Sequence, residues 1–280
     1  MTDLPIAPGG LDPGELKCRC AELWSHPFVR LLVGDTFRPG GLALTTTMLD
    51  RLALPAGTTV LDVGSGAGAT LRLLRQRGLD GVGVDHSATL AAEASAQAPV
   101  VVGDAERLPF AAASFDAVLV ECVLSALPDK RAAVDAFGRV LRPGGRLALT
   151  DMTQDGPLPE PLSSLVAWVA CTTGALPADG YPRLLADHGF NVQQVDDRSG
   201  DLRALVAKAR RRFALLAGAV GTGILDGLDA TLLPGGDQLP TDDPHAMLQA
   251  GRDTLAQLAA AVETGDLGYV AIVASVRGRA

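Results

Sequence analysis

Between residues 59 and 150, short runs of β-branched residues alternate with stretches whose apolar positions recur at helical spacing. Strands that alternate with helices are typical of a parallel sheet covered by helices on both faces. The pattern predicts strands at 58–63, 81–85, 99–102, 115–121 and 145–151, and helices at 69–77, 88–97 and 130–141. The sequence therefore indicates an α/β fold.

After residue 151 the pattern loosens, and prolines at 157, 159 and 161 indicate a loop. The elements predicted beyond it are helices at 162–172 and 181–188, a strand at 190–196, helices at 202–219 and 244–263 joined by a loop at 221–243, and an antiparallel strand at 268–276. This order predicts four parts: an N-terminal helical lid at 1–50, a main domain at 51–200, a helical insertion at 201–267 and the final strand at 268–280.

Composition narrows the function classes. With 24 Lys plus Arg against 32 Asp plus Glu, the net charge of −8 provides no broad basic surface, so we expect no nucleic acid partner. The N-terminus lacks the basic and apolar regions of a signal peptide, and charges interrupt the longest apolar stretches, so we expect a cytoplasmic protein without a membrane span. Its four cysteines should then be reduced.

The most informative local pattern is a buried strand that runs directly into a glycine turn and then a helix. It reads Val-Leu-Asp-Val-Gly-Ser-Gly-Ala-Gly from Val60 to Gly68. Glycines permit positive φ and close approach of a ligand, and the following helix N-terminus presents unpaired N–H groups. The alternating glycines differ from the dinucleotide fingerprint, which makes dinucleotide binding the lesser interpretation.

This block resembles motif I of the class I methyltransferases, and segments 103–110, 114–118 and 139–147 continue the resemblance. The resemblance implies a Rossmann-like, seven-stranded fold with a helical insertion before the last strand, and S-adenosylmethionine as cofactor. It implies that the glycine loop and Asp62 hold the methionine end, that Asp85 accepts the ribose hydroxyls, and that Asp104 meets the adenine. The cofactor-binding residues expected from it are Asp62, Gly64, Ser65, Gly66, Gly68, Asp85, His86, Asp104, Ala105 and Glu121.

The cysteines bear on the methyl acceptor. Cys122 directly follows the fourth strand, before Pro128-Asp129-Lys130, and Cys171 precedes Gly174-Ala175-Leu176. These two contexts resemble the arsenite methyltransferases. The resemblance implies that Cys122 and Cys171, joined by Cys18 and Cys20, bind trivalent arsenic as thiolates, which are soft ligands. The acceptor would then be a small metalloid species, and no resident metal is expected.

Several alternatives stay open at this stage. The cysteines are also compatible with packing as small hydrophobes, which would leave a small organic O, N or S nucleophile as acceptor, or a cofactor-binding protein without turnover. Cys18, Cys20 and His26 lack the spacing of a zinc hairpin. We read residues 38–45 as a loop from which Arg38 or Thr45 reaches the methionine carboxylate, with a glycine hinge as the alternative. Either a monomer or a homodimer is compatible with the sequence.

Overall fold

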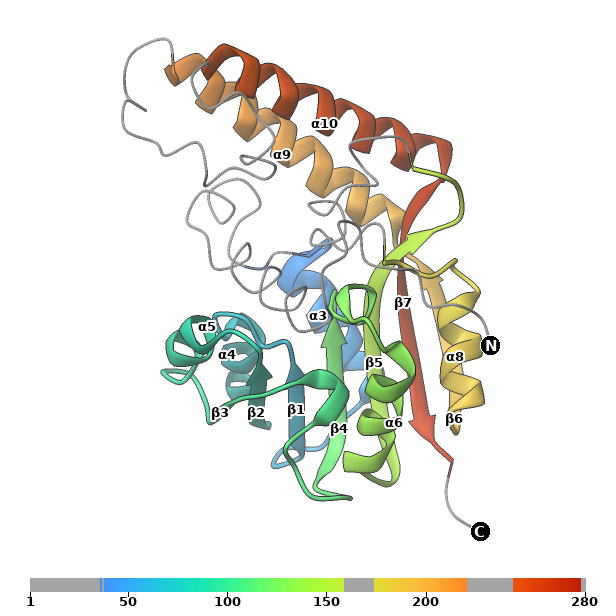
Figure 1. The fold of residues 1–280 in the computed structure, drawn as a ribbon. Coiled ribbons are helices and arrows are strands. Elements are labelled where there is room, and N and C mark those ends of the chain that lie inside the picture. The colour runs from blue at the N-terminus through green and yellow to red at the C-terminus, as the bar shows by residue number, and fades with distance from the viewer. Residues whose placement is uncertain (1–35, 37, 159–173, 221–243, 278–280) are drawn as a thin grey trace.

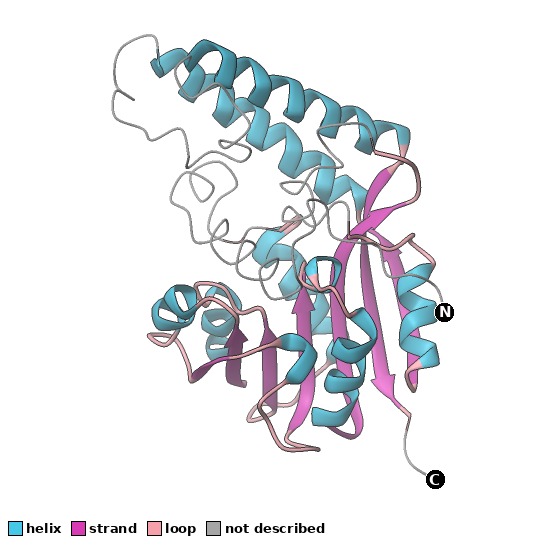
Figure 2. Cartoon of the chain, viewed as in Figure 1, coloured by secondary structure: helices cyan, strands magenta, loops and turns pink. Residues whose placement is uncertain are grey.

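The computed structural model describes residues 36, 38–158, 174–220 and 244–277 and contains a seven-stranded sheet of order β3-β2-β1-β4-β5-β7-β6 (Figures 1 and 2). Its strands are β1 Thr59–Val63, β2 Asp80–Asp85, β3 Val100–Val102, β4 Phe115–Glu121, β5 Leu141–Gln154, β6 Phe190–Asp197 and β7 Leu267–Val276. Strands β1 to β5 run parallel, and β7 lies antiparallel between β5 and β6. The predicted α/β, seven-stranded fold is confirmed.

Helices cover both faces of this sheet. They are α3 Gly41–Leu52, α4 Ala69–Gln76, α5 Ala88–Ala94, α6 Lys130–Val140, α8 Gly180–Asp187, α9 Ser199–Val220 and α10 Pro244–Thr264, with single 3-10 turns η2 Ala105–Arg107 and η3 Leu124–Ala126. Alternating strand residues divide the core: Leu119 packs with α3, α4 and the start of α9, whereas Val118 packs with α6 and α8. Each face of the central strands is therefore buried, as expected for a parallel sheet.

Strand β5 is longer than the predicted 145–151. It begins at Leu141, which pairs with Phe115, and it extends to Gln154, which pairs with Leu267 of β7. The additional residues have no strong strand pattern of their own. They become strand because a neighbour from a distant part of the chain satisfies their backbone groups.

The prediction of a loop over residues 38–45 was wrong from Gly41 onward, where α3 begins. Gly40 has a left-handed backbone with φ 75°, which turns the chain into the helix. Leu44, Met48 and Leu52 recur at intervals of four and are buried, so this segment gains its helical form from packing on the sheet.

The helical insertion before the last strand is confirmed. Helix α9 leaves β6 almost directly, α10 returns to β7, and the two helices lie side by side beyond the carboxyl ends of the parallel strands (Figure 1). Buried Leu202, Val206 and Phe213 mark the packed side of α9. The predicted helix at 162–172 and the predicted loop at 221–243 both lie wholly outside the described residues. Within the described part of the chain, no helix has the length and apolar character to cross a membrane.

Two glycine-to-alanine substitutions test this packing in opposite directions. A Cβ on Gly83 of β2 would lie 2.8 Å from Ser65 Oγ, so we expect Gly83→Ala to lower the free energy of unfolding by about 1–3 kcal/mol. A Cβ on Gly138 of α6 meets only the Phe190 ring at 3.6 Å, so Gly138→Ala should raise stability by about 0.5–1 kcal/mol. Urea denaturation measures the free energy of unfolding of each variant. Equal changes in this free energy for Gly83→Ala and Gly138→Ala would contradict the packing described.

Candidate active site

The glycine turn after β1 lies at the carboxyl edge of the sheet and is bound to the neighbouring strand β2. The backbone N–H groups of Gly64 and Ser65 donate to the Val84 carbonyl at 2.8 and 3.1 Å. Asp85 accepts from Gly66 N through Oδ2 at 2.8 Å and from Ser87 N through Oδ1 at 2.9 Å. The carboxylate of Asp85 thus fixes the turn and has lone pairs left for other donors.

The glycines are required by this geometry. Gly64, Gly66 and Gly68 have φ values of 70°, 52° and 85°, in the region that L side chains rarely adopt. A Cβ on Gly64 would lie 2.4 Å from Val123 Cγ2, whereas a Cβ on Gly66 would meet nothing within 4 Å. The turn therefore packs closely on the segment after β4 and leaves open space above Gly66, where a ligand can approach the backbone.

A buried charge network lies beside this turn, at the carboxyl end of β4. Arg38 Nη2 lies 3.0 Å from Glu121 Oε2, and the two side chains are only 11% and 6% exposed. The same nitrogen donates to the hydroxyls of Thr45 at 2.7 Å and Thr70 at 2.8 Å. Both hydroxyls donate onward to Glu121, at 2.8 and 3.0 Å. The network links the segment before α3, helix α3 and helix α4 to β4.

Sequence reasoning placed Glu121 in the cofactor-binding set but missed Thr70 and the pairing of Glu121 with Arg38. The Thr70 hydroxyl sits in the first turn of α4, two residues after Gly68, and that position was the available signal. The Arg38 pairing joins residues that are far apart in sequence and had no such signal.

Three buried polar atoms at this edge lack a hydrogen-bond partner among the residues that the structure describes. They are Arg38 Nε, Asp62 Oδ2 and Ser65 Oγ. Burial raises the pKa of Asp62 well above its ordinary value, and the nearby Glu121 carboxylate raises it further, against the opposing effect of Arg38. Buried polar groups are normally satisfied, so a guanidinium nitrogen, a carboxylate oxygen and a hydroxyl here are available to a ligand that carries charged and polar groups.

The residues expected at the nucleoside end lie along the same edge. Asp104 Oδ1 accepts from Glu106 N at 2.9 Å and caps η2, which begins at Ala105. Asp104 and Ala105 are partly exposed and His86 is exposed. Burial raises the pKa of Asp85, an effect that its hydrogen bonds from Ser87 and Gly66 oppose. Acidic groups therefore end β2 and follow β3, next to the open space at Gly66.

Cys122 is the first residue after β4. Its backbone is left-handed with φ 59°, its N–H donates to the Thr150 carbonyl at 2.7 Å, and its side chain is partly exposed. The structure thus brings Cys122 to the edge that carries Asp62 and the glycine turn. Cys18, Cys20 and Cys171, like the cysteine–histidine pattern at 18–26, lie outside the described residues.

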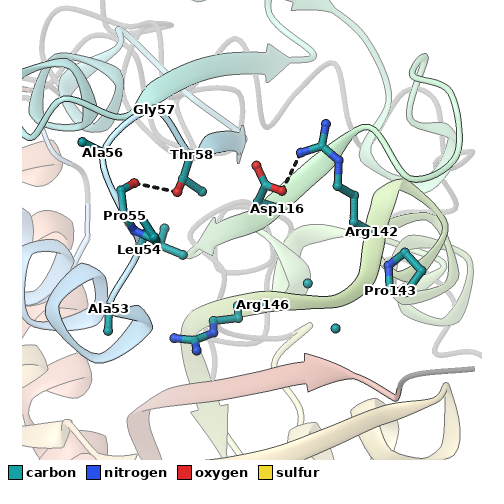
Figure 3. A pocket seen from close by; sticks show the side chains of 12 residues that line it. Ala53, Leu54, Pro55, Ala56, Gly57, Thr58, Asp116, Arg142, Pro143 and Arg146 are labelled. Atoms are coloured by element: carbon teal, nitrogen blue, oxygen red, sulfur yellow. Dashed lines mark hydrogen bonds and ion pairs between the residues drawn. The ribbon is translucent and has the colours of Figure 1, made fainter.

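A hollow of about 530 Å³ lies at the opposite, amino edge of the sheet (Figure 3). It is lined by residues before β1 and at the starts of β4 and β5, including Asp116 and Arg142, which form an ion pair, and Arg146, which donates to the Leu52 carbonyl. Ligands of open α/β sheets bind outside the carboxyl ends of the strands. This hollow is therefore not the candidate active site.

Comparison with known proteins identifies the family of this chain. Residues 61–149 match a family model described as a methyltransferase domain. An O-methyltransferase of Pyrenophora dematioidea is 31% identical over 202 residues, which cover 68% of this chain and 74% of that protein. The chain belongs to the class I S-adenosylmethionine-dependent methyltransferases.

Two further matches place this methyltransferase among its relatives. The arsenite methyltransferase of Halobacterium salinarum is 34% identical over 157 residues, and the match spans 51% of this chain but only 40% of that protein. The solved phosphoethanolamine N-methyltransferase 2 of Haemonchus contortus, bound to S-adenosyl-L-methionine, shares the fold with a TM-score of 0.71 at 20% identity, over 97% of this chain and 61% of that one. S-adenosylmethionine is the cofactor of this methyltransferase.

The left-handed backbone at Cys122 predicts an unusual order of stabilities. We expect Cys122→Gly to be more stable than Cys122→Ala by about 1 kcal/mol, because a Cβ is disfavoured at this φ. At Ala117, in the interior of β4, replacement by glycine should instead lower stability. Thermal or urea unfolding of the two Cys122 variants measures this order of stabilities. An alanine variant at least as stable as the glycine variant would contradict the left-handed conformation.

The raised pKa of Asp62 should make the stability of the fold depend on pH. Its pKa is raised in the folded protein, so between pH 4 and that raised pKa the folded state binds a proton that the unfolded chain has released. Stability is therefore lost as pH rises through this window. We expect Asp62→Asn to be more stable than wild type at pH 7, and the difference to be smaller at pH 4, where the wild-type side chain is increasingly protonated in both states.

Denaturation of wild type and Asp62→Asn at several pH values, without cofactor, measures this difference. A difference that is constant across the pH range would mean that Asp62 keeps an ordinary pKa in the folded protein.

Proposed function

We propose that this methyltransferase transfers the methyl group of S-adenosylmethionine to a trivalent arsenic species, arsenite or an organoarsenical, held by cysteine thiolates. The observation that carries the proposal is the position of Cys122. It lies at the carboxyl end of β4, and the next residue, Val123, packs against Gly64 of the cofactor turn. A ligand on the Cys122 thiolate would lie at the same edge as the cofactor's methionine end.

The cofactor-binding roles follow from the groups at that edge. Asp85 has lone pairs left that would accept the ribose hydroxyls, Asp104 would meet the adenine, and the open space at Gly66 would accommodate the cofactor. Asp62 Oδ2 suits the cofactor's ammonium group. Arg38 Nε suits its carboxylate, although Nη2 already contacts Glu121 and two threonine hydroxyls and Nη1 donates to the Thr36 carbonyl.

When bound, S-adenosylmethionine supplies an electrophilic methyl group whose carbon–sulfur bond breaks with the electron pair left on sulfur. The protein's own residues would position the methyl acceptor. Cys122, with Cys171 and the Cys18–Cys20 pair, would hold arsenic as soft thiolate ligands with its lone pair directed at the methyl carbon. That lone pair carries no proton, so the site needs no general base. Thiolate ligands require reduced cysteines, which agrees with the proposed cytoplasmic location.

The organic acceptor is the second candidate. The O-methyltransferase match covers 68% of this chain, whereas the arsenite methyltransferase match covers 51%. In that case the acceptor is a small oxygen nucleophile, and Cys122 packs beside it without ligating anything. Both candidates place a small acceptor at the same carboxyl edge and need no nucleic acid.

The test compares wild type with Cys122→Ser and Cys171→Ser in an assay of S-adenosylhomocysteine release. Arsenite and a monomethyl arsenical are the acceptors, with excess thiol present. We expect either substitution to lower turnover at least 100-fold, because a hydroxyl is a poor ligand for arsenic(III). Affinity for S-adenosylmethionine, measured by calorimetry, should stay within about twofold.

Wild-type enzyme that fails to methylate either arsenical, but methylates a phenolic or other hydroxyl acceptor, would exclude the arsenic proposal. Turnover of arsenite that survives both substitutions would exclude the thiolate mechanism.

A further inference from the structure

The turn after β4, residues 122–127, is held from the β5 side by a buried carboxylate. Asp151 is 0% exposed and belongs to none of the expected cofactor contacts. Its Oδ2 accepts from Ser125 N at 2.9 Å, and its Oδ1 accepts from Ser125 Oγ at 2.5 Å and from Met152 N at 2.8 Å. The one side chain therefore fixes both the backbone and the hydroxyl of Ser125.

Lys130, the first residue of α6, holds the same turn from the other side. Its Nζ donates to the Ser125 carbonyl at 3.2 Å and to the Leu127 carbonyl at 2.8 Å. Its positive charge also acts on Asp151, where it opposes the rise in pKa caused by burial. The Asp151 carboxylate thus accepts from the Ser125 N–H, and the Lys130 ammonium donates to the Ser125 carbonyl. The turn is held by one anion and one cation.

A fully buried carboxylate costs free energy, and well-packed apolar residues often replace such groups without loss of stability. This charge has a geometric consequence that an apolar residue would not provide. The turn begins with Cys122, whose left-handed backbone needs its surroundings to hold it, and continues with Val123 against Gly64. The turn that carries Cys122 is therefore fixed at two places, by the hydrogen bond from Cys122 N to the Thr150 carbonyl and by the contacts of Ser125 with Asp151.

The cofactor turn has separate anchors. Gly64 and Ser65 are bound to Val84, and Gly66 is bound to Asp85, so its conformation does not depend on residues 122–127 alone. Loosening the turn after β4 should for that reason disturb the acceptor side of the edge more than the cofactor side.

We propose that Asp151 and Lys130 are positioning residues, which clamp residues 122–127 through Ser125 so that Cys122 keeps one orientation toward the methyl acceptor. This proposal rests on the proposed acceptor site at Cys122. It adds that the acceptor side of the edge has a support of its own, separate from the cofactor contacts.

The first test is the reactivity of Cys122 in the full-length protein. Lys130→Met removes both Nζ contacts and keeps most of the side chain's apolar stem, and Ser125→Ala removes the hydroxyl contact to Asp151. We expect iodoacetamide to alkylate Cys122 at least fivefold faster in each variant than in wild type. Mass spectrometry of the digested protein measures the extent of alkylation at each of the four cysteines separately.

Two controls separate positioning from general destabilisation. Lys208→Met makes the same substitution on the exposed side of α9 and should leave the Cys122 rate unchanged. Val134→Ala truncates a buried α6 residue that takes no part in the clamp, and so lowers global stability. If Cys122 in Val134→Ala reacts as fast as in Lys130→Met at matched stability, the clamp has no positioning role and the proposal fails.

The second test separates turnover from cofactor binding. In Lys130→Met we expect kcat for the methyl acceptor to fall at least tenfold, while the affinity for S-adenosylhomocysteine changes less than twofold. Equal losses in both would overturn the proposal. The alkylation result does not need an acceptor: if Cys122 is released in the variants but wild type methylates no arsenical, the clamp stands and the arsenic assignment alone fails.

Discussion

The ion pair between Arg38 and Glu121 is the interaction on which the organisation of the active edge depends. Two charges that are almost fully buried are costly to remove from water, and they are tolerated here because two threonine hydroxyls share them. Those hydroxyls come from α3 and α4, which flank β1 on one face of the sheet. The network therefore fixes the positions of both helices relative to the end of β4.

Three further carboxylates, those of Asp62, Asp85 and Asp151, lie along the same edge of the sheet as this network. Asp62 lies buried close enough to Glu121 for the two carboxylates to repel, which leaves Asp62 ready for a positively charged ligand. Asp85 holds the glycine turn from the side of β2, and Asp151 holds the turn after β4 from the side of β5. Two carboxylates thus anchor the two turns of this edge, and the carboxylate of Asp62 lies buried beside Glu121.

Much of this could be predicted from sequence, and the remainder depended on contacts between distant segments. The strands up to residue 121, the glycine turn and the helical insertion all have local signals, namely alternation, glycine spacing and helical periodicity. The end of the fourth strand at Glu121 was predicted correctly, because the apolar run stops there. Its partner Arg38, 83 residues earlier, was expected to bind the cofactor, and no local pattern shows that the guanidinium is already engaged. The extension of β5 to Gln154 likewise depends on pairing with β7.

The central claim is that the carboxyl edge around Gly66 binds S-adenosylmethionine beside Cys122. A crystal structure with S-adenosylhomocysteine bound tests it most directly. We expect the ribose at Asp85, the amino acid end near Asp62 and the Arg38–Glu121 pair, and the sulfur on the side of Cys122. Ligand density in the hollow between Arg142 and Arg146 at the opposite edge, or a cofactor sulfur directed away from Cys122, would contradict it.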